Sequence, residues 1–418
     1  MRYEGGAVSL AGRELVLGVT GSIAAYKAAY LLRELRRLGA GVTVVMTEHA
    51  REFVAPLTFR TLSGRPVLTD LFDPREPAAV EHVALAERTD LVIVAPATAN
   101  ALARAALGLA DDFLGTLLLA SRAPLLFVPA MDGEMWYHPT VQAHVAALRA
   151  RGATVMEPGR GELASGLHGT GRLPEVPDIV EIALRAVWPT RDLTADHVLV
   201  TAGPTREPVD PVRYFSNRSS GRMGYALATL AARRGAQVTL VTGPTSLPPP
   251  LGVRLIPVQT AEEMRDAVRH ALAPATIVIK AAAVADYRVP RPAPGKIRSK
   301  QADLTVALTP TPDILREIGE ARGSRFLVGF AAETEDLRGS AQAKLRAKGI
   351  DLIVANDVSR ADIGFDADAN EVAMLDRWGG VVELPRGPKW EIADRILDRV
   401  QELRRAAALA PSAPVARP

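Results

Sequence analysis

Two series of short apolar runs, each alternating with amphipathic helical stretches, constrain the fold of this chain more than any other feature. The first series begins with runs at 15–19 and 42–46, on either side of a helical pattern at 22–38. The second begins with similar runs at 198–201 and 237–241. Such alternation is typical of a parallel sheet with helices on both faces. The sequence therefore predicts an α/β protein with two doubly wound, Rossmann-like domains.

A seam at 187–196, which carries Pro and polar residues, separates the two series. We therefore place one domain at 1–194 and the other at 195–418. The Ala- and Pro-rich tail, 406–418, is expected to be disordered, as chain ends often are. Further strands are expected at 91–95, 125–128, 276–279, 326–328 and 352–355, and further helices at 99–119, 223–234 and 261–271.

Composition excludes several classes of function. The chain has 418 residues, a net charge of only +3 and basic residues that alternate with acidic ones, so nothing suggests a nucleic-acid partner. It has no cysteine, which excludes disulfides, thiolate zinc sites and any mechanism that uses a protein thiol. No uncharged apolar run reaches the roughly 18 residues of a membrane span, and the first residues lack the apolar core of a signal peptide. We expect a cytoplasmic enzyme with small-molecule substrates and no membrane partner.

Three loops follow strands of the first series and suggest a ligand site. The loop at 18–24 places Gly21 and Ser22 where backbone N–H groups and a hydroxyl can meet a phosphate at a helix N-terminus. It lacks the GxGxxG pattern of dinucleotide sites, so a mononucleotide fits better than NAD, although an ordinary tight turn explains it equally well. The loops at 96–100 and 129–136 follow two further strands, where ligands of open sheets bind. Together the loops favour a site, even though the Met and Trp side chains there also suit a core.

The order of these motifs resembles the flavin-dependent cysteine decarboxylases. The resemblance rests on GSIA at 21–24, PATAN at 96–100, PAMDGEMW at 129–136, GTGR at 169–172 and the isolated His82. It implies a flavodoxin-like flavoprotein domain with FMN as cofactor and His82 in the active site, where a surface histidine is the alternative. The FMN contacts implied are Gly21, Ser22, Ile23, Thr47, Pro96, Thr98, Asn100 and Met131. In this chemistry a thiol is oxidised, the neighbouring carboxylate leaves, and the resulting ene-thiolate is protonated and reduced.

Two positions of the implied catalytic set depart from the pattern of these decarboxylases. Asp132 stands where an Asn is usual, and an ionised Asp would repel a substrate carboxylate that an amide would hold. Ser165 stands where a Cys is usual, and a hydroxyl is a far weaker acid than a thiol. The identity of the proton donor stays open. Either His168 or a protonated Asp132 supplies the proton, or the reduction is impaired.

The second series contains a long connection, within 198–225, that is rich in Arg, Asn and Ser. Loops of this length are usually functional or disordered, and such donors before a helix N-terminus suit an anion. Three cations lie at 295–300, and the spacing of Lys344 and Lys348 places both on one helix face. Small residues before Asp286 would let a flat ring approach the backbone. The sequence thus suggests an anion site, with a solvated loop and a solvated helix face as alternatives.

The second half resembles phosphopantothenate–cysteine ligases in the order of its motifs, GPTREPVDPVRYFSNRSSGRMG, AAVADY, KI, TPDI, GFAAET and AND. The resemblance implies that CTP activates the carboxylate of 4′-phosphopantothenate as an acyl-cytidylate, which the amine of cysteine attacks. It places Asn217 and Lys296 in the catalytic set. The CTP contacts implied are Lys280, Ala281, Ala282, Asp286, Lys296, Pro312, Asp313, Ile314, Leu315, Phe330, Lys344 and Lys348. Mg²⁺ is expected with the triphosphate, without assigned protein ligands.

The two halves in this order resemble the bifunctional enzymes of coenzyme A biosynthesis. These ligate cysteine to 4′-phosphopantothenate and then decarboxylate the product to 4′-phosphopantetheine. The alternative keeps the ligase but makes the flavin domain non-catalytic, or stops it at the ene-thiol because the Cys is absent. Another flavin reaction such as prenyl transfer, and a two-domain NAD(P) reductase, fit less well. The resemblance also implies a homo-oligomer, with a dodecamer as the family's assembly.

Overall fold

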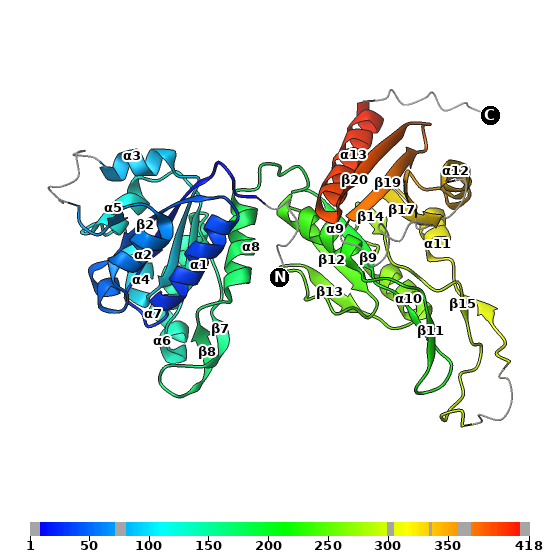
Figure 1. Ribbon diagram of the computed structural model, residues 1–418, viewed down its shortest axis with the longest axis horizontal. Helices are drawn as coiled ribbons and strands as arrows, with labels where there is room; N and C mark the ends of the chain where they lie inside the picture. The colour runs from blue at the N-terminus through cyan, green and yellow to red at the C-terminus, as the bar shows by residue number, and fades with distance from the viewer. Residues whose placement is uncertain (1–8, 72–80, 299–304, 334–336, 358–368, 410–418) are drawn as a thin grey trace. The chain divides into compact units, whose positions relative to one another are not determined.

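The computed structural model describes residues 9–71, 81–298, 305–333, 337–357 and 369–409. Its contacts divide the chain into two compact units between Pro189 and Thr190, and Figure 1 shows the elements of each unit. Residues 190–194, which we expected in the first domain, belong to the second unit. Within the described part of the chain, no helix is long and apolar enough to cross a membrane.

A six-stranded parallel sheet forms the centre of the first unit. Its order is β3-β2-β1-β4-β5-β6. The chain crosses the sheet after β3, so the direction of winding reverses between the neighbouring strands β1 and β4. The strands are β1 (Glu14–Val19), β2 (Gly41–Met46), β3 (Val67–Leu68), β4 (Leu91–Ala97), β5 (Leu125–Pro129) and β6 (Thr154–Val155). Their Val, Leu and Ile side chains are buried on both faces, which is why they occur as continuous apolar runs. The predicted doubly wound fold is confirmed for this unit.

Helices cover both faces of this sheet. One core contains residues of α1 (Ala25–Arg37) and α8 (Val176–Ala186), and α2 (Pro56–Ser63) packs beside α1. The opposite core contains residues of α3 (Glu81–Arg88), α4 (Ala99–Leu107), α5 (Phe113–Ala120), α6 (Gly133–Tyr137) and α7 (Pro139–Ala150). A short 3-10 helix, η1 (Glu48–Glu52), follows β2. The sheet is thus enclosed, and its strand ends are left to carry the loops.

The prediction of a single helix at 99–119 is wrong. The chain forms α4 and α5 instead, because Gly108 ends α4 in the left-handed region at φ +72° and Asp112 begins α5 as its N-cap. A second feature missed from the sequence is the antiparallel hairpin of β7 (Gly159–Glu162) and β8 (His168–Arg172). The hairpin carries the segment that includes Ser165.

An eight-stranded mixed sheet forms the centre of the second unit. Its order is β13-β12-β9-β14-β17-β18-β19-β20, and the last two strands run antiparallel to their neighbours. The strands are β9 (His197–Ala202), β12 (Gln237–Thr242), β13 (Arg254–Pro257), β14 (Ile277–Lys280), β17 (Phe326–Glu333), β18 (Leu352–Asp357), β19 (Ala369–Asp376) and β20 (Val381–Pro388). The parallel part is doubly wound as predicted, and the direction of winding changes between β9 and β14.

The helices of the second unit again cover two faces. One core contains residues of α10 (Ala261–Ala271), α11 (Ile314–Glu320) and α12 (Leu337–Lys348), whereas α9 (Arg222–Arg233) and α13 (Lys389–Leu409) pack together elsewhere. The tail prediction is wrong for 406–409, which continue α13 because Ala and Leu favour a helix. The rest of the predicted tail, 410–418, lies outside the described residues.

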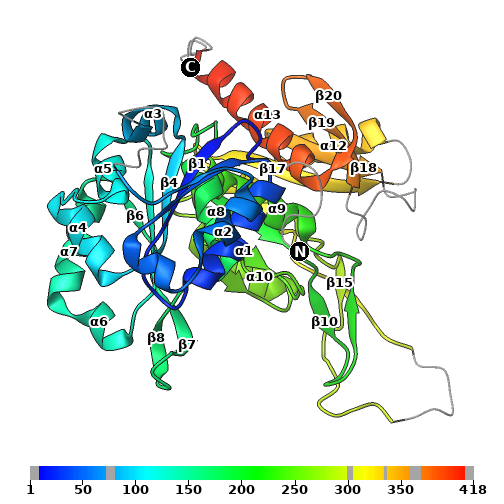
Figure 2. The same cartoon turned by 60° about the vertical axis from the view of Figure 1, so that its left-hand side comes forward.

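The long connection after β9 is not a simple loop. It contains an antiparallel hairpin of β10 (Arg206–Pro208) and β11 (Tyr214–Ser216). A second pair, β15 (Tyr287–Arg288) and β16 (Thr309–Pro310), contacts β10, and the two views show these strands projecting from the sheet (Figures 1 and 2). Gly221, at φ +76°, is the N-cap of α9.

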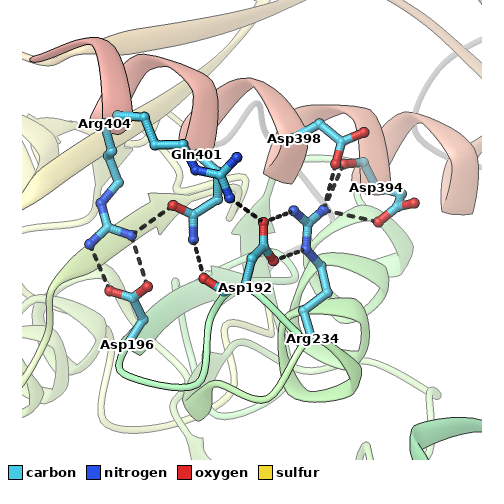
Figure 3. A network of polar contacts seen from close by, with 8 residues as sticks. Asp192, Asp196, Arg234, Asp394, Asp398, Gln401 and Arg404 are labelled. Carbon is cyan, nitrogen blue, oxygen red and sulfur yellow. Dashed lines mark hydrogen bonds and ion pairs between the residues drawn. The ribbon is translucent and has the colours of Figure 1, made fainter. Parts of the chain in front are cut away.

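A cluster of charged and polar residues fixes the start of the second unit to α13 (Figure 3). This seam cluster consists of Asp192, Asp196, Arg234, Asp394, Asp398, Gln401 and Arg404. The guanidinium of Arg234 donates to both carboxylate oxygens of Asp192, at 2.9 and 2.7 Å, and is 1% exposed. Arg404 binds Asp196 in the same two-pronged way, at 2.8 and 2.7 Å. Asp192 and Asp196 of the seam are therefore held to Arg234 and to α13 by charge-assisted hydrogen bonds.

Candidate functional site

A cavity of about 1220 Å³ lies at the carboxyl ends of the strands in the first unit. Four of the predicted FMN contacts line it, namely Gly21, Thr47, Thr98 and Asn100. Each comes from a loop or helix start that follows β1, β2 or β4. The cavity is large enough for a small-molecule ligand. The structure thus brings together three segments that are far apart in the sequence.

A buried threonine joins two of these segments. Thr20, which is 2% exposed, donates its hydroxyl hydrogen to the carbonyl oxygen of Pro96 at 2.7 Å and accepts a hydrogen bond from the backbone N–H of Thr98 at 3.2 Å. The hydroxyl of Thr98 in turn caps α4 through the N–H of Ala101. Sequence reasoning missed Thr20 because its partners lie 76 and 78 residues away.

The lining of the cavity fits a flavin mononucleotide. Its apolar part suits a flat ring system and consists of Phe53, Leu71, Val94, Phe113, Leu114, Leu118, Phe127 and Met135. Its polar part offers hydroxyl and amide donors together with Arg51, Arg104 and His49, which suits a phosphate. Carboxylates also line the cavity, but Arg104 forms ion pairs with Asp111 and, at 3.3 Å, with Asp112.

Four other predicted FMN contacts lie outside this lining. Ser22 accepts a hydrogen bond from the N–H of Ala24 at 3.3 Å, and Ile23 is 59% exposed. Pro96 contributes its carbonyl to Thr20, and Met131 packs against the core under α4 to α7. These four residues stay predicted contacts.

The three residues predicted for catalysis in the first unit fall into two places. His82, on α3, meets the ring of Phe113 edge-on with centroids 6.4 Å apart, and Phe113 lines the cavity. Asp132 and Ser165 instead lie together, because the hydroxyl of Ser165 donates to Oδ2 of Asp132 at 2.8 Å. The two departures from the expected pattern are therefore direct neighbours.

In the second unit, predicted residues meet where the winding of the sheet reverses. The N–H groups of Ala281 and Ala282, directly after β14, bind the carbonyl and hydroxyl oxygens of Thr201 on β9 at 3.2 Å each. The side-chain amide of Asn217 donates to the carbonyl oxygen of Val284 at 2.9 Å. Crevices at such reversal points are the usual ligand sites of open α/β sheets.

Two cations and two carboxylates surround this reversal point. Burial lowers the pKa of Lys280 from 10.5 to about 8, while nearby Asp286 opposes the decrease and Lys348 adds to it. The ammonium of Lys348 forms an ion pair with Asp313. Lys280 and Lys348 are thus close enough to repel each other, which an anionic ligand would relieve.

The segment that carries the predicted turn at 312–315 is fixed to the loop after β14. Thr311 donates its hydroxyl hydrogen to the carbonyl oxygen of Ala285 at 2.6 Å and its N–H to that of Asp286 at 3.0 Å. Asp313 caps α11, while Ile314 is buried and Leu315 packs against the same core. Pro312 lies between these contacts, half-buried.

The remaining predicted residues are less closely gathered. Phe330 follows Gly329, the neighbour of Lys280 across the sheet, and Lys344 is exposed one turn before Lys348 on α12. Lys296 is exposed on the segment between β15 and β16. The roles of these three residues stay predictions.

Asp210 holds the segment near Lys296 and was missed from the sequence. It is 3% exposed and accepts hydrogen bonds from the N–H groups of Val212, Arg213 and Ile297, at 2.8, 2.8 and 3.2 Å. Burial raises its pKa, but these N–H groups outweigh burial and hold the pKa below its usual value. The Asp-Pro pair at this point was a turn signal that could have drawn attention to it. Among the described residues, no three His, Asp or Glu side chains converge to hold a metal ion.

Comparisons with known proteins cover both units. The family model for flavoproteins matches residues 7–187, and the model for the C-terminal domain of the DNA/pantothenate metabolism flavoprotein matches residues 193–403. The coenzyme A biosynthesis bifunctional proteins CoaBC of Bacillus subtilis and Escherichia coli are each 45% identical to this chain, over 94% of its length and 98% of theirs.

A solved structure, the C-terminal domain of a coenzyme A biosynthesis bifunctional protein CoaBC, is 40% identical with a TM-score of 0.45 and covers 52% of this chain and 100% of that one. The relatives above match nearly the whole of both lengths, and the two family models divide the chain in the same order as its two units. The chain therefore belongs to the family of the coenzyme A biosynthesis bifunctional protein CoaBC.

Proposed function

We propose that this protein catalyses two steps of coenzyme A biosynthesis. The second unit joins cysteine to 4′-phosphopantothenate with CTP, through an acyl-cytidylate. The first unit decarboxylates the product, 4′-phosphopantothenoylcysteine, to 4′-phosphopantetheine with FMN. The observation that carries the proposal is the 45% identity over 94% of the chain to bifunctional relatives, since it spans both units at once.

The reversal point of the second sheet supports the ligase step. Both the activation and the transfer build negative charge at phosphorus or at a carbonyl oxygen, so fixed cations and amides stabilise them. Lys280 and Lys348 supply cations, and Asn217 keeps an amide beside the loop after β14. We assign Lys296 to the phosphate side as well, with Mg²⁺ brought in by the triphosphate. The backbone of residues 281–282 would contact the cytosine base of CTP.

The cavity of the first unit supports the decarboxylation step. Gly21, Thr47, Thr98 and Asn100 would hold FMN there, and the flavin would accept a hydride and later return it. His82 lies beside Phe113 at the cavity wall and would face the substrate thiol. We also propose a cytoplasmic homo-oligomer, which rests on the family resemblance.

The Ser165–Asp132 contact favours a second candidate for the first unit. Because neither residue matches the usual Cys and Asn, this unit would bind flavin without completing the reduction. The ligase step is the same in both candidates. The two therefore differ only in the final product.

The experiment uses purified, flavin-loaded protein with 4′-phosphopantothenate, CTP, Mg²⁺ and cysteine, and follows the products by mass. We expect 4′-phosphopantetheine. A product two hydrogens lighter would mean that the carboxylate leaves but the reduction fails. Accumulation of 4′-phosphopantothenoylcysteine would show a ligase with an inactive flavin unit. No cysteine adduct at all would refute the ligase assignment.

A further inference from the structure

The contact between Ser165 and Asp132 has a geometry that is fixed from both sides. Asp132 follows β5 and caps α6, with its Oδ1 accepting the N–H of Glu134 at 3.2 Å, so Oδ2 is left for Ser165 at 2.8 Å. Ser165 lies in the turn between β7 and β8, which is closed by a hydrogen bond from the N–H of Leu163 to the carbonyl of Leu167 at 2.8 Å. The two side chains are thus presented by turns whose backbones are hydrogen-bonded.

The hairpin is docked against the segment that carries Asp132. The N–H of Met131 donates to the carbonyl oxygen of Gly171 at 3.0 Å, and the hydroxyl of Tyr137 lies 3.2 Å from that of Thr170. A Cβ on Gly171 would lie 2.1 Å from the carbonyl oxygen of Met131, so only glycine permits this approach. The Ser165–Asp132 contact is therefore one of several that bring β8 to α6.

The pair lies at the surface, and α6, which Asp132 caps, contributes to the lining of the cavity. Ser165 is exposed and Asp132 is half-buried, so a hydrogen bond between them adds little to folding, about 1 kcal/mol. Met135, three residues after Asp132 on α6, lines the cavity that fits FMN. A substrate that reaches Met135 would therefore lie near the start of α6, where Asp132 is the N-cap.

We propose that Asp132 and Ser165 form a proton-transfer pair, in which Asp132 stores the proton released by the substrate thiol and returns it through the Ser165 hydroxyl to the carbon that has lost its carboxylate. The inference rests on the proposed decarboxylation. A hydroxyl alone is too weak an acid for this task, but a hydroxyl whose oxygen is reprotonated by a neighbouring carboxylic acid is not. Asp132 in place of Asn thus compensates for the weak acidity of Ser165 in place of Cys.

The atoms and electrons of this sequence balance. Bound flavin would accept a hydride from the carbon that bears the thiol, and Asp132 would accept the proton of the sulfur, which leaves a thioaldehyde. The carbon–carbon bond to the carboxylate then breaks, CO₂ leaves, and the electron pair stays in an ene-thiolate. The α-carbon takes a proton from the Ser165 hydroxyl, which takes one from Asp132, and return of the hydride would convert the renewed thioaldehyde to a thiolate. One proton and one hydride thus leave the substrate and return, and the thiolate takes its last proton from water.

The decisive variant is Asp132→Asn, because it keeps the structure and removes only the stored proton. An Asn side chain caps a helix as well as Asp does and still accepts a hydrogen bond from Ser165. Ser165→Ala removes the relay itself. Ser165→Cys in the Asp132→Asn background restores an acidic group that needs no relay. Tyr137→Phe is the matched control, because it loosens the same hairpin and leaves the pair intact.

The full-length, flavin-loaded proteins receive 4′-phosphopantothenoylcysteine directly, and the ratio of saturated to ene-thiol product is measured by mass together with the bleaching of flavin absorbance. We expect mostly saturated product from the unchanged protein and from Tyr137→Phe. In Asp132→Asn and Ser165→Ala the ratio should fall at least tenfold and reduced flavin should accumulate. The Ser165→Cys, Asp132→Asn double variant should recover the saturated product.

A second readout separates chemistry from structure without flavin. Hydrogen–deuterium exchange over 159–172 should increase by a similar factor in Ser165→Ala and Tyr137→Phe, although only the first alters the product ratio. Saturated product from both Asp132→Asn and Ser165→Ala would overturn the pair while leaving the decarboxylation standing, as would ene-thiol alone from the unchanged protein. No turnover of the supplied substrate by any of these proteins would overturn the proposed decarboxylation as well.

Discussion

Lys280, at the carboxyl end of β14, gives the second unit a cation whose charge depends on pH near 8, because burial has lowered its pKa from 10.5. A bound triphosphate favours the ammonium form and raises this pKa again. Binding of CTP should therefore take up a proton between pH 8 and 10.5, and affinity should fall as pH rises through this window. Calorimetry in two buffers of different ionisation enthalpy measures the uptake.

Lys280→Met is the control for this effect, since it keeps the length of the side chain without a titratable group. Equal proton uptake by the variant and the unchanged protein would contradict the assignment. The same pKa predicts a stability effect in the absence of ligand. Unfolded lysine binds more protons than Lys280 does in this window, so the free energy of unfolding should rise with pH between about 8 and 10.5.

Thr20 provides a prediction for the flavin cavity. Thr20→Val keeps the shape of the side chain but leaves the carbonyl of Pro96 and the N–H of Thr98 without their hydroxyl partner, at a cost of about 1–3 kcal/mol. FMN affinity should fall about tenfold, measured by the fluorescence of released flavin. Thr20→Ser keeps the hydroxyl and should bind like the unchanged protein. Unaltered affinity in Thr20→Val would show that the link between the two loops does not shape the site.

At the scale of elements, the start of α5 depends on one side-chain cap. Oδ1 of Asp112 accepts the N–H of Gly115 at 2.7 Å, and loss of such a cap costs about 1 kcal/mol. Asp112→Ala should lower the free energy of unfolding by this amount in urea titrations. Asp112→Asn, which can still cap, should lose much less. An equal loss in both variants would point instead to the ion pair with Arg104.

The elements that the sequence predicted share one property, which is a strong local pattern. The parallel strands are buried on both faces and appear as apolar runs, and α10 carries a capping box at Thr260 with a regular apolar stripe. The hairpin of β7 and β8 could not be predicted in this way. Its strands, GRGE and HGTGR, contain no alternation of apolar and polar residues, and its docking depends on the close approach of Gly171 to Met131.

The residues of the candidate sites can also be divided into those that a local sequence pattern predicts and those that it does not. Predicted residues such as Gly21, Thr98 and the segment at 281–282 lie directly after strands, where position in the sequence determines position at the sheet edge. Thr20 and Asp210 could not be found in this way, because their importance comes from partners 76 to 87 residues away. The meeting of Asp132 with Ser165 also required the hairpin, which the sequence did not reveal.

At the scale of the whole molecule, the two units should respond separately to damage in the seam cluster. Arg234 is buried and binds three carboxylates, so Arg234→Met should destabilise the second unit by about 3 kcal/mol. The transition of the first unit in differential scanning calorimetry should stay where it is. Arg316→Met removes an exposed pair with Glu320 and should cost under about 1 kcal/mol. A common shift of both transitions would mean that the units unfold together.

The seam cluster also bears on how such a chain can be assembled from parts. Every partner of Asp192 and Asp196 named above lies after them in the chain, on the far side of the division between Pro189 and Thr190. A genetic crossover between codons 189 and 190 would therefore transfer each of these ion pairs whole. The same proximity of the seam to α13 allows a circular permutant of the second unit, joined near the contacts of Asp192 and Asp196 with Gln401 and Arg404. The division between Pro189 and Thr190 is thus a place where evolution or an engineer can cut without separating Asp192 and Asp196 from their ion-pair partners.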